Sequence, residues 1–139
     1  MPLANLDEIT ESFAYFDNWE DKYRFIIDLG KGLPHLPESA RREENLVRGC
    51  QSQVWLLAEV DPETRKVHLL IDSDAHIVRG LIAIVLAAYD GRSAEEILRF
   101  DIEGLFDELQ LLKHLSPTRG NGLRALIGKI RELAATCCA

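Results

Sequence analysis

The spacing of hydrophobic side chains divides the chain into a helical, an extended and a second helical part. Near the N-terminus hydrophobic residues recur at the spacing of an amphipathic helix: Leu6, Ile9, Phe13 and Phe16. Asn18 is a suitable N-cap for a second helix, because Glu20 and Asp21 follow in its first turn. This helix is expected to end near Gly30, and the proline-containing stretch 31–42 is expected to be irregular.

The middle of the chain changes to a period of two residues. Hydrophobic residues alternate with others on both sides of the turn sequence Asp61–Thr64: Val54, Leu56, Ala58 and Val60, then Val67, Leu69 and Ile71. This alternation predicts an antiparallel hairpin. A third strand can come from Leu46–Arg48, with residues 49–52 as the connection into the hairpin.

Helical signals return after the hairpin. Residues 75–89 are apolar nearly all round, which predicts a helix buried on most sides. Ser93 and Glu96 form a capping box for the next helix, residues 103–112 predict another, and Ser116-Pro117 marks the start of the last one. The pattern predicts an α+β fold, with a small three-stranded antiparallel sheet packed with helices, in a single domain over residues 1–139.

Composition and charge exclude some classes of function. The 139 residues carry a formal net charge of −7, which argues against nucleic acid or an anionic membrane as the main partner. No apolar run approaches the ~20 residues that span a bilayer, and no signal peptide is visible. Three cysteines without regular spacing give no disulfide framework, so we expect a cytoplasmic protein.

Cys50 is the candidate reactive residue. A persulfide carrier needs a thiolate, and a cationic neighbour such as Arg48 on a loop made flexible by Gly49 would favour ionisation. Trp55 could provide apolar cover. No resolving thiol is near in sequence, since the next cysteine is Cys137. The same pattern also fits a small buried hydrophobic cysteine.

Four blocks of sequence together resemble the SufE family of sulfur acceptors. Gly49-Cys50-Gln51-Ser52-Gln53-Val54-Trp55 resembles the active-site signature of that family. The other blocks follow the family order: Asn18-Trp19-Glu20-Asp21-Lys22-Tyr23 with Leu29-Gly30, Asp72-Ser73-Asp74-Ala75-His76-Ile77-Val78-Arg79-Gly80-Leu81, and His114-Leu115-Ser116-Pro117-Thr118-Arg119-Gly120-Asn121-Gly122-Leu123. The resemblance covers roughly residues 6–133.

The resemblance implies a fold similar to the IscU-type scaffold proteins and a sulfur-carrying role for Cys50. It implies that a SufS-type cysteine desulfurase donates the persulfide and is stimulated, and that an iron–sulfur assembly scaffold receives the sulfur. The Cys50 loop would be sheltered and would move outward for transfer, with Gly49 as a pivot. No bound cofactor is implied, and the chain would be a substrate-like partner rather than an autonomous enzyme.

The same blocks supply supporting site candidates: Arg119, Asp72, Asp74, His114 and Gly49. Arg119 is expected to contact the loop or the desulfurase. For Asp72 and Asp74, a role in a turn and a helix cap stands beside a role in docking. Some relatives serve a second desulfurase branch linked to tRNA modification, so the downstream recipient stays open; we expect a monomer that docks on a dimeric desulfurase.

Two other classes of protein compete with the relay. A metal or iron–sulfur scaffold would use several cysteines or histidines at short spacings, whereas Cys50 stands alone and the histidines are scattered. A cysteine hydrolase would need a histidine base, for which His76 and His114 are available. The adjacent Cys137 and Cys138 are expected on a frayed tail that does not reach Cys50.

Overall fold

The computed structural model describes residues 5–49 and 52–137 of the chain. Its elements are, in order, α1 (Leu6–Tyr15), α2 (Trp19–Lys31), the short 3-10 turns η1 (Glu38–Ala40) and η2 (Glu43–Asn45), β1 (Val54–Val60), β2 (Lys66–Ser73), α3 (His76–Tyr89), β3 (Arg92–Ser93), α4 (Ala94–Arg99), α5 (Ile102–Leu109), α6 (Leu111–His114) and α7 (Pro117–Cys137). The predicted α+β class is confirmed.

The sheet has three antiparallel strands in the order β1-β2-β3. The predicted hairpin is confirmed, and its turn is held by the Asp61 carboxylate, which accepts hydrogen bonds from the N–H groups of Glu63 and Thr64. The predicted third strand is wrong in position. Leu46 forms a single bridge to Trp55, whereas the third strand is β3, which pairs with the start of β2.

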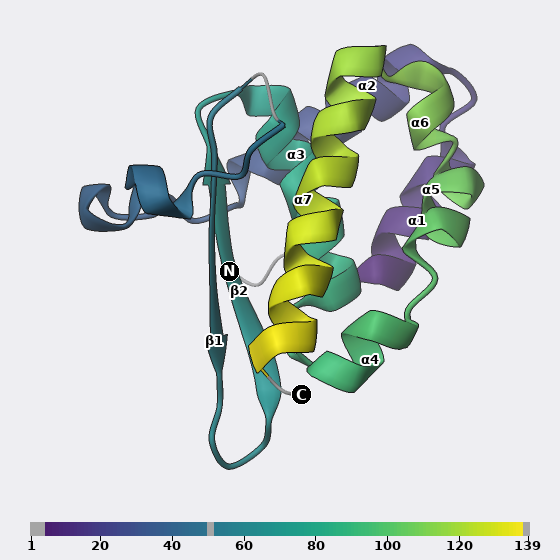
Figure 1. Cartoon of the computed structure of the whole chain (residues 1–139). Coiled ribbons are helices and arrows are strands. Elements are labelled where there is room, and N and C mark those ends of the chain that lie inside the picture. The colour runs from purple at the N-terminus through teal and green to yellow at the C-terminus, as the bar shows by residue number, and fades with distance from the viewer. Residues whose placement is uncertain (1–4, 50–51, 138–139) are drawn as a thin grey trace.

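One face of the hairpin packs on helices. Alternate side chains of β1 and β2 are buried there against α3 and α7, with Val67, Leu69 and Ile71 the buried positions of the middle of β2. Figure 1 shows both helices on the same side of the hairpin, α7 in front of α3, with α1, α2, α5 and α6 beyond them. The hydrophobic core therefore lies between the sheet and the helical layer.

The helices α2 and α3 cross at a very short distance. Gly80 of α3 lies against the backbone of Ile26, and a methyl group built on Gly80 would overlap the Ile26 carbonyl. Gly80 is therefore needed where it stands, because only a residue without a β-carbon allows this approach. The contact fixes the position of α3, which carries residues of the site described below.

Capping residues mark the starts of α2 and α4. Asn18 caps α2 by accepting from the N–H of Asp21, and Ser93 and Glu96 form the predicted capping box of α4. The single helix predicted over residues 103–112 is wrong. Gln110 adopts a left-handed conformation with φ of 57° and separates α5 from α6.

The opposite face of the hairpin is partly covered by residues 33–47, which include η1 and η2. In Figure 1 this segment projects from the sheet on the side away from α7. It buries Trp55 of β1 and Asp72 of β2, which are paired across the two strands. Further along the hairpin this face is open, and Leu70 is exposed.

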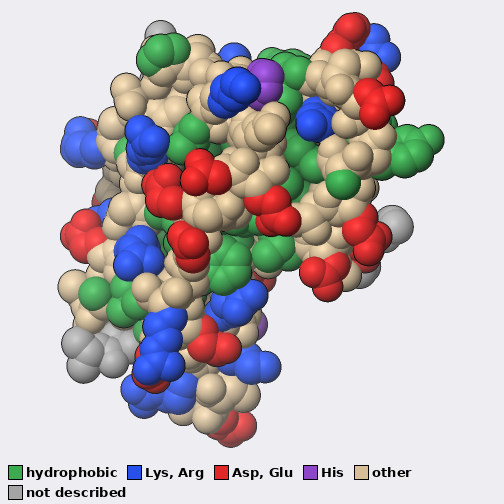
Figure 2. Space-filling view, turned by 90° about the vertical axis from the view of Figure 1, so that its right-hand side faces the viewer, with side chains coloured by type: hydrophobic (Ala, Val, Ile, Leu, Met, Phe, Trp, Pro, Cys, Tyr) green, Lys and Arg blue, Asp and Glu red, His purple; other side chains and the backbone are tan. Residues whose placement is uncertain are grey.

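Charged side chains are spread over the surface. Figure 2 views the molecule from the side on which α5 and α6 lie in Figure 1, and acidic side chains gather near the middle of that face. The helix α5 exposes Glu103, Asp107 and Glu108.

Among the described residues, no helix has the length and hydrophobicity of a membrane-spanning segment.

Candidate functional site

The loop that carries Cys50 is closed at its base by strand-like pairing. The N–H of Val47 donates to the carbonyl of Val54 at 2.8 Å, and Leu46 bridges to Trp55. Residues 48–53 therefore connect two segments whose separation is fixed. Cys50 and Gln51 themselves lie outside the described residues.

Gly49 holds the first described end of this loop against α7. Its φ of 95° lies in the left-handed region, which glycine adopts without strain. A β-carbon at this position would come within 3.1 Å of the Ala125 side chain. Both the backbone conformation and the close approach to α7 therefore favour glycine, and the sequence-based candidate Gly49 has a defined structural reason.

Asp74 holds the other end of the loop. Its Oδ1 accepts a hydrogen bond from the N–H of Gln53 at 3.1 Å, and its own N–H donates to the Gln53 carbonyl at 3.4 Å. Asp74 does not cap α3, for which Ala75 is the N-cap residue. Its carboxylate instead fixes the point at which the loop enters β1.

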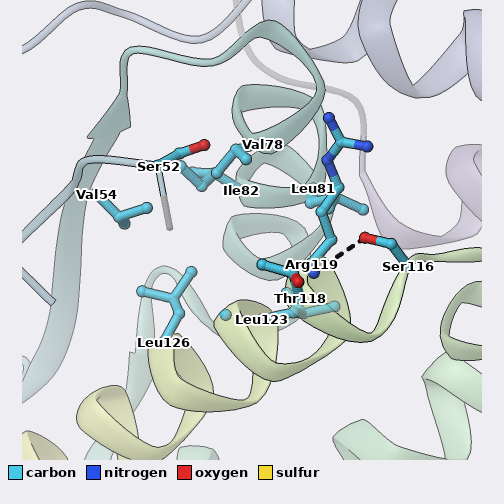
Figure 3. A pocket seen from close by; sticks show the side chains of 11 residues that line it. Ser52, Val54, Val78, Leu81, Ile82, Ser116, Thr118, Arg119, Leu123 and Leu126 are labelled. Carbon is cyan, nitrogen blue, oxygen red and sulfur yellow. Dashed lines mark hydrogen bonds between the residues drawn. The ribbon is translucent and has the colours of Figure 1, made fainter. Parts of the chain in front are cut away.

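A cavity of about 280 Å³ opens beside the second end of the loop. Figure 3 shows it between the start of β1, α3 and the first turns of α7. Its polar rim includes Ser52, Ser116, Thr118 and Arg119. Its apolar wall is formed by side chains from all three elements: Val54, Val78, Leu81, Ile82, Leu123 and Leu126. The arrangement can shelter a small apolar or polarizable group such as sulfur while offering polar atoms at the edge.

Arg119 is the cationic group of this rim. Ser116 Oγ accepts a hydrogen bond from its backbone N–H at 3.2 Å, which fixes the first turn of α7. The Arg119 side chain extends past Leu81 along the cavity, as Figure 3 shows. Within residues 5–49 and 52–137 its guanidinium has no ion-pair partner, so its charge is available to a group that enters the cavity.

Asp72 lies on the other side of β1, in a buried ionic cluster. Its side chain is fully buried, and its two carboxylate oxygens are shared between two arginines and two backbone groups. Arg41 donates to Oδ2 at 2.8 Å, Arg79 donates to Oδ1, and the N–H groups of Leu36 and Ser73 donate at 2.9 and 2.8 Å. The carboxylate of Asp72 does not reach the surface, and this arrangement favours a structural role for Asp72 over a role in docking.

The pKa of Asp72 is lowered by this environment. Burial alone would raise the pKa of the carboxyl, but the N–H donors of Leu36 and Ser73, together with Arg41 and Arg79, outweigh it. Asp72 is therefore held in its ionised form.

His35 also contacts the cluster. Its Nδ1 lies 3.1 Å from Arg79 Nη1 and accepts a hydrogen bond there, because a guanidinium only donates.

His114 does not line the cavity. It ends α6, and its ring stacks on the indole of Trp19 with centroids 4.4 Å apart and an interplanar angle of 15°. This contact joins two of the sequence blocks noted above, the one that opens α2 and the one that precedes α7. His76, the other histidine available to a hydrolase, is exposed at the start of α3 and also lies outside the cavity lining.

Sequence reasoning missed Arg41 and the pairing of Asp72 with Arg79. One signal was present, since Arg79 is the only charged residue after His76 in the otherwise apolar α3. A buried arginine requires an acidic partner. Arg41 gave no comparable signal, because it stands in a charged segment next to Arg42, Glu43 and Glu44.

Metal-ligating side chains do not gather in the described ranges: no three of His, Cys, Asp or Glu are placed so that they could hold an ion. The helix α7 runs to Cys137, so the backbone of that residue is helical, whereas the frayed tail was expected to include it. Cys138 lies outside the described residues.

Residues 7–134 match the family described as SufE, Fe-S metabolism associated domain. Two curated relatives are uncharacterized SufE-like proteins of Rhizobium etli and Rhizobium meliloti. The first is 50% identical over 134 residues, which cover 95% of this chain and 90% of the relative. The second is 48% identical over 134 residues, which cover 95% and 96%.

The fold recurs in a solved structure of low sequence identity. The solution structure of a hypothetical protein from Thermus thermophilus superposes with a TM-score of 0.74 at 21% identity, over 97% of this chain and 96% of that one. The resemblance first found in four blocks of sequence is thus confirmed over most of the chain.

Proposed function

Because the chain belongs to the SufE family of sulfur acceptors in iron–sulfur metabolism, we propose that Cys50 accepts sulfane sulfur as a persulfide from a cysteine desulfurase. The desulfurase is expected to be of the SufS type and to turn over faster when this acceptor removes its sulfur. An iron–sulfur assembly scaffold is the expected recipient. Residues 1–139 are proposed to act as one SufE-like domain, monomeric in itself and docking on a dimeric desulfurase.

The proposed transfer is a thiol–persulfide exchange. The Cys50 thiolate attacks the outer sulfur of the desulfurase persulfide and forms a new S–S bond. The S–S bond to the desulfurase cysteine breaks, and that cysteine leaves as a thiolate. No net oxidation occurs, because the sulfane sulfur keeps its oxidation state and only changes its carrier.

The observation that carries the proposal is the cavity beside the cysteine loop, which has an apolar wall and a polar rim. Gly49 is packed against α7, whose first turns form one wall of the cavity, and Ser52 lines the cavity itself. A persulfide needs protection from water and from reducing thiols between its arrival and its departure. The apolar part of this hollow offers that protection, and the polar rim with Arg119 offers a positive charge to the thiolate or persulfide anion.

The remaining site candidates receive distinct roles in this proposal. Arg119 places a positive charge at the cavity rim that no described residue pairs with, where it would stabilise a thiolate or a persulfide anion, or an acidic group of the desulfurase. Asp74 ties Gln53 to β2 and limits how far the loop moves. His114 has a structural role, because its stacking on Trp19 ties the end of α6 to the start of α2.

The test is mass spectrometry of this protein after incubation with a SufS-type desulfurase and L-cysteine. We expect one or more sulfur atoms to be added to the peptide that contains Cys50 and none to be added after Cys50→Ser. The variant with both Cys137→Ser and Cys138→Ser is the matched control and should accept sulfur like the parent. Sulfur found on the terminal cysteines instead, with none on Cys50, would contradict the proposal.

A second experiment separates the two proposed recipients. The sulfur-loaded protein is mixed with an iron–sulfur scaffold or with the sulfur acceptor of a tRNA-modification branch, and loss of sulfur from Cys50 is followed. Transfer to the scaffold alone supports iron–sulfur assembly. Preferential transfer to the other acceptor would assign the chain to the tRNA-modification branch.

A further inference from the structure

The buried cluster around Asp72 and the base of the cysteine loop share one side chain. Arg41 donates to Asp72 through Nη2, and its guanidinium carbon lies 5.1 Å from the centroid of the Trp55 ring. Trp55 and Asp72 are paired across β1 and β2. Arg41 therefore bridges two strands through a charge-assisted hydrogen bond on one and a cation–π contact on the other.

Trp55 is also the residue at which the loop closes. It bridges to Leu46 one residue beyond the hydrogen bond from Val47 to Val54. The segment that carries Arg41 is the same segment that leads into the loop through η2 and Leu46. The contacts of Arg41 with Trp55 and Asp72 thus hold residues 41–47 against β1. They set the position at which the chain enters the loop.

We propose that Arg41 is a positioning residue for the Cys50 loop: it latches the segment 33–47 onto the hairpin and so holds the loop ends at the cavity. This rests on the proposed function of Cys50 as the sulfur carrier. Release of the latch frees the incoming side of the loop while Asp74 still holds the outgoing side.

Arg41 rather than Arg79 is the member of the cluster that can release. The Arg79 side chain is 7% exposed and also donates to the Leu33 carbonyl, so it is locked in place. The Arg41 side chain is 32% exposed. Among the described residues its buried Nε has no hydrogen-bond partner, so the guanidinium is held only through Nη2 and through the ring of Trp55. Asp72 keeps Arg79 and both backbone donors when Arg41 leaves.

The test measures the alkylation rate of Cys50, with peptide mass spectrometry to assign the modified residue. Arg41→Ala is expected to raise this rate about tenfold, because the segment that leads to Cys50 is no longer held against β1. Arg41→Lys keeps the charge but loses the planar contact with Trp55, and an intermediate rate is expected. The matched control is Arg42→Ala, which removes an exposed arginine paired with Glu44 and should change the rate by less than about twofold.

Two further measurements separate positioning from general loss of stability. Ile9→Val trims a buried side chain of α1, far from the loop in sequence, and should lower the urea midpoint without raising alkylation of Cys50. Hydrogen exchange of Arg41→Ala should increase in residues 41–49 and stay unchanged in α1. Equal alkylation of Arg41→Ala and Arg42→Ala, or a rise in Ile9→Val equal to that in Arg41→Ala, would overturn the proposal.

The result is independent of sulfur transfer. Alkylation uses a small reagent, so it reports on the loop even if Cys50 never accepts sulfur. If Arg41→Ala accelerates alkylation while no sulfur reaches Cys50, the latch stands and the proposed function fails. If Cys50 accepts sulfur and Arg41→Ala alkylates at the parental rate, the proposed function stands and the latch fails.

Discussion

Two regions border the cysteine loop, and they treat charge in opposite ways. On the face of the hairpin covered by residues 33–47, Asp72 is fully buried, and its oxygens are occupied by Arg41, Arg79 and backbone N–H groups. On the other side, the cavity has an apolar wall and a polar rim, and Arg119 stands at that rim without an ion-pair partner in the described ranges. A paired charge holds structure in place, whereas an unpaired charge beside a hollow can act on what enters it.

The comparison predicts that the ionic cluster contributes chiefly to the stability of the fold. The cavity is expected to contribute chiefly to the acceptance and retention of sulfur by Cys50. The largest effect is expected for Asp72→Ala. It leaves Arg79 buried without its carboxylate, and breaking a buried pair in this way costs about 3–5 kcal/mol. Urea unfolding measures the loss. Asp74→Ala, which removes a carboxylate that is exposed, is the matched control and should cost less than about 1.5 kcal/mol.

A loss for Asp72→Ala no larger than that for Asp74→Ala would contradict the assignment. It would mean that Arg79 finds solvent or another acceptor when Asp72 is removed. The cluster would then be a surface feature in energetic terms, in spite of its burial.

The sequence predicted those elements that depend on local signals. The caps at Asn18 and Ser93 and the turn at Asp61 each satisfy backbone donors within three residues. The alternation in β1 and β2 was visible because one face of the hairpin is buried along most of its length. The existence of the elements could therefore be read without knowledge of the tertiary contacts.

The errors concern contacts that join distant segments. β3 has only two residues, and it becomes a strand because α3 returns the chain to the start of β2. The segment Leu46–Arg48 was expected to form a strand, but Leu46 pairs with β1 at a single position, Trp55. At the break between α5 and α6, Gln110 adopts the left-handed conformation although it is not glycine, and no local pattern predicted this.

The candidate site was predictable in part for the same reason. Cys50, Gly49 and Arg119 belong to blocks that resemble a known family, so their importance could be expected without geometry. The cluster could not be assembled from sequence, because Arg41 and Asp72 are 31 residues apart and stand in segments of unrelated character. Only Arg79, charged in an apolar helix, indicated that a buried partner exists.

The second prediction concerns the cavity wall. Leu123→Ala removes a buried side chain that lines the cavity and should cost about 2–3 kcal/mol of unfolding free energy. It should also shorten the lifetime of sulfur on Cys50 in the presence of a reducing thiol, because the hollow becomes larger and wetter. Mass spectrometry of the loaded protein over time measures that lifetime.

The matched control for the wall is Ile130→Ala in the same helix. Ile130 is buried but does not line the cavity. We expect a similar loss of stability with an unchanged lifetime of the bound sulfur. Equal lifetimes in the two variants would remove the sheltering role from the cavity.

The third prediction is a pH dependence of folding. The pKa of Asp72 is lower in the folded state than the value of about 3.9 for an unfolded chain. Its contribution to stability is therefore complete above that value and is lost as the pH falls toward the folded pKa. Urea unfolding between about pH 5 and pH 3 should show a steeper loss in the parent than in Asp72→Asn. Parallel curves would show that other carboxyl groups, such as Asp61 and Glu96, account for the acid sensitivity.

The smallest effect on folding is expected for Arg119→Ala, and this variant separates the two regions most sharply. Its side chain is exposed and unpaired within the described ranges, so the free energy of unfolding should change by less than about 0.5 kcal/mol. Sulfur acceptance by Cys50 should fall about tenfold, because the cation beside the cavity is lost. Arg119→Lys should recover part of the rate, and Arg124→Ala, an exposed arginine of α7 outside the cavity lining, should retain all of it. If Arg119→Ala accepted sulfur at the parental rate, Arg119 would have no role in sulfur acceptance beyond that of any other surface arginine. The functional role of the cavity would then rest on its apolar wall alone.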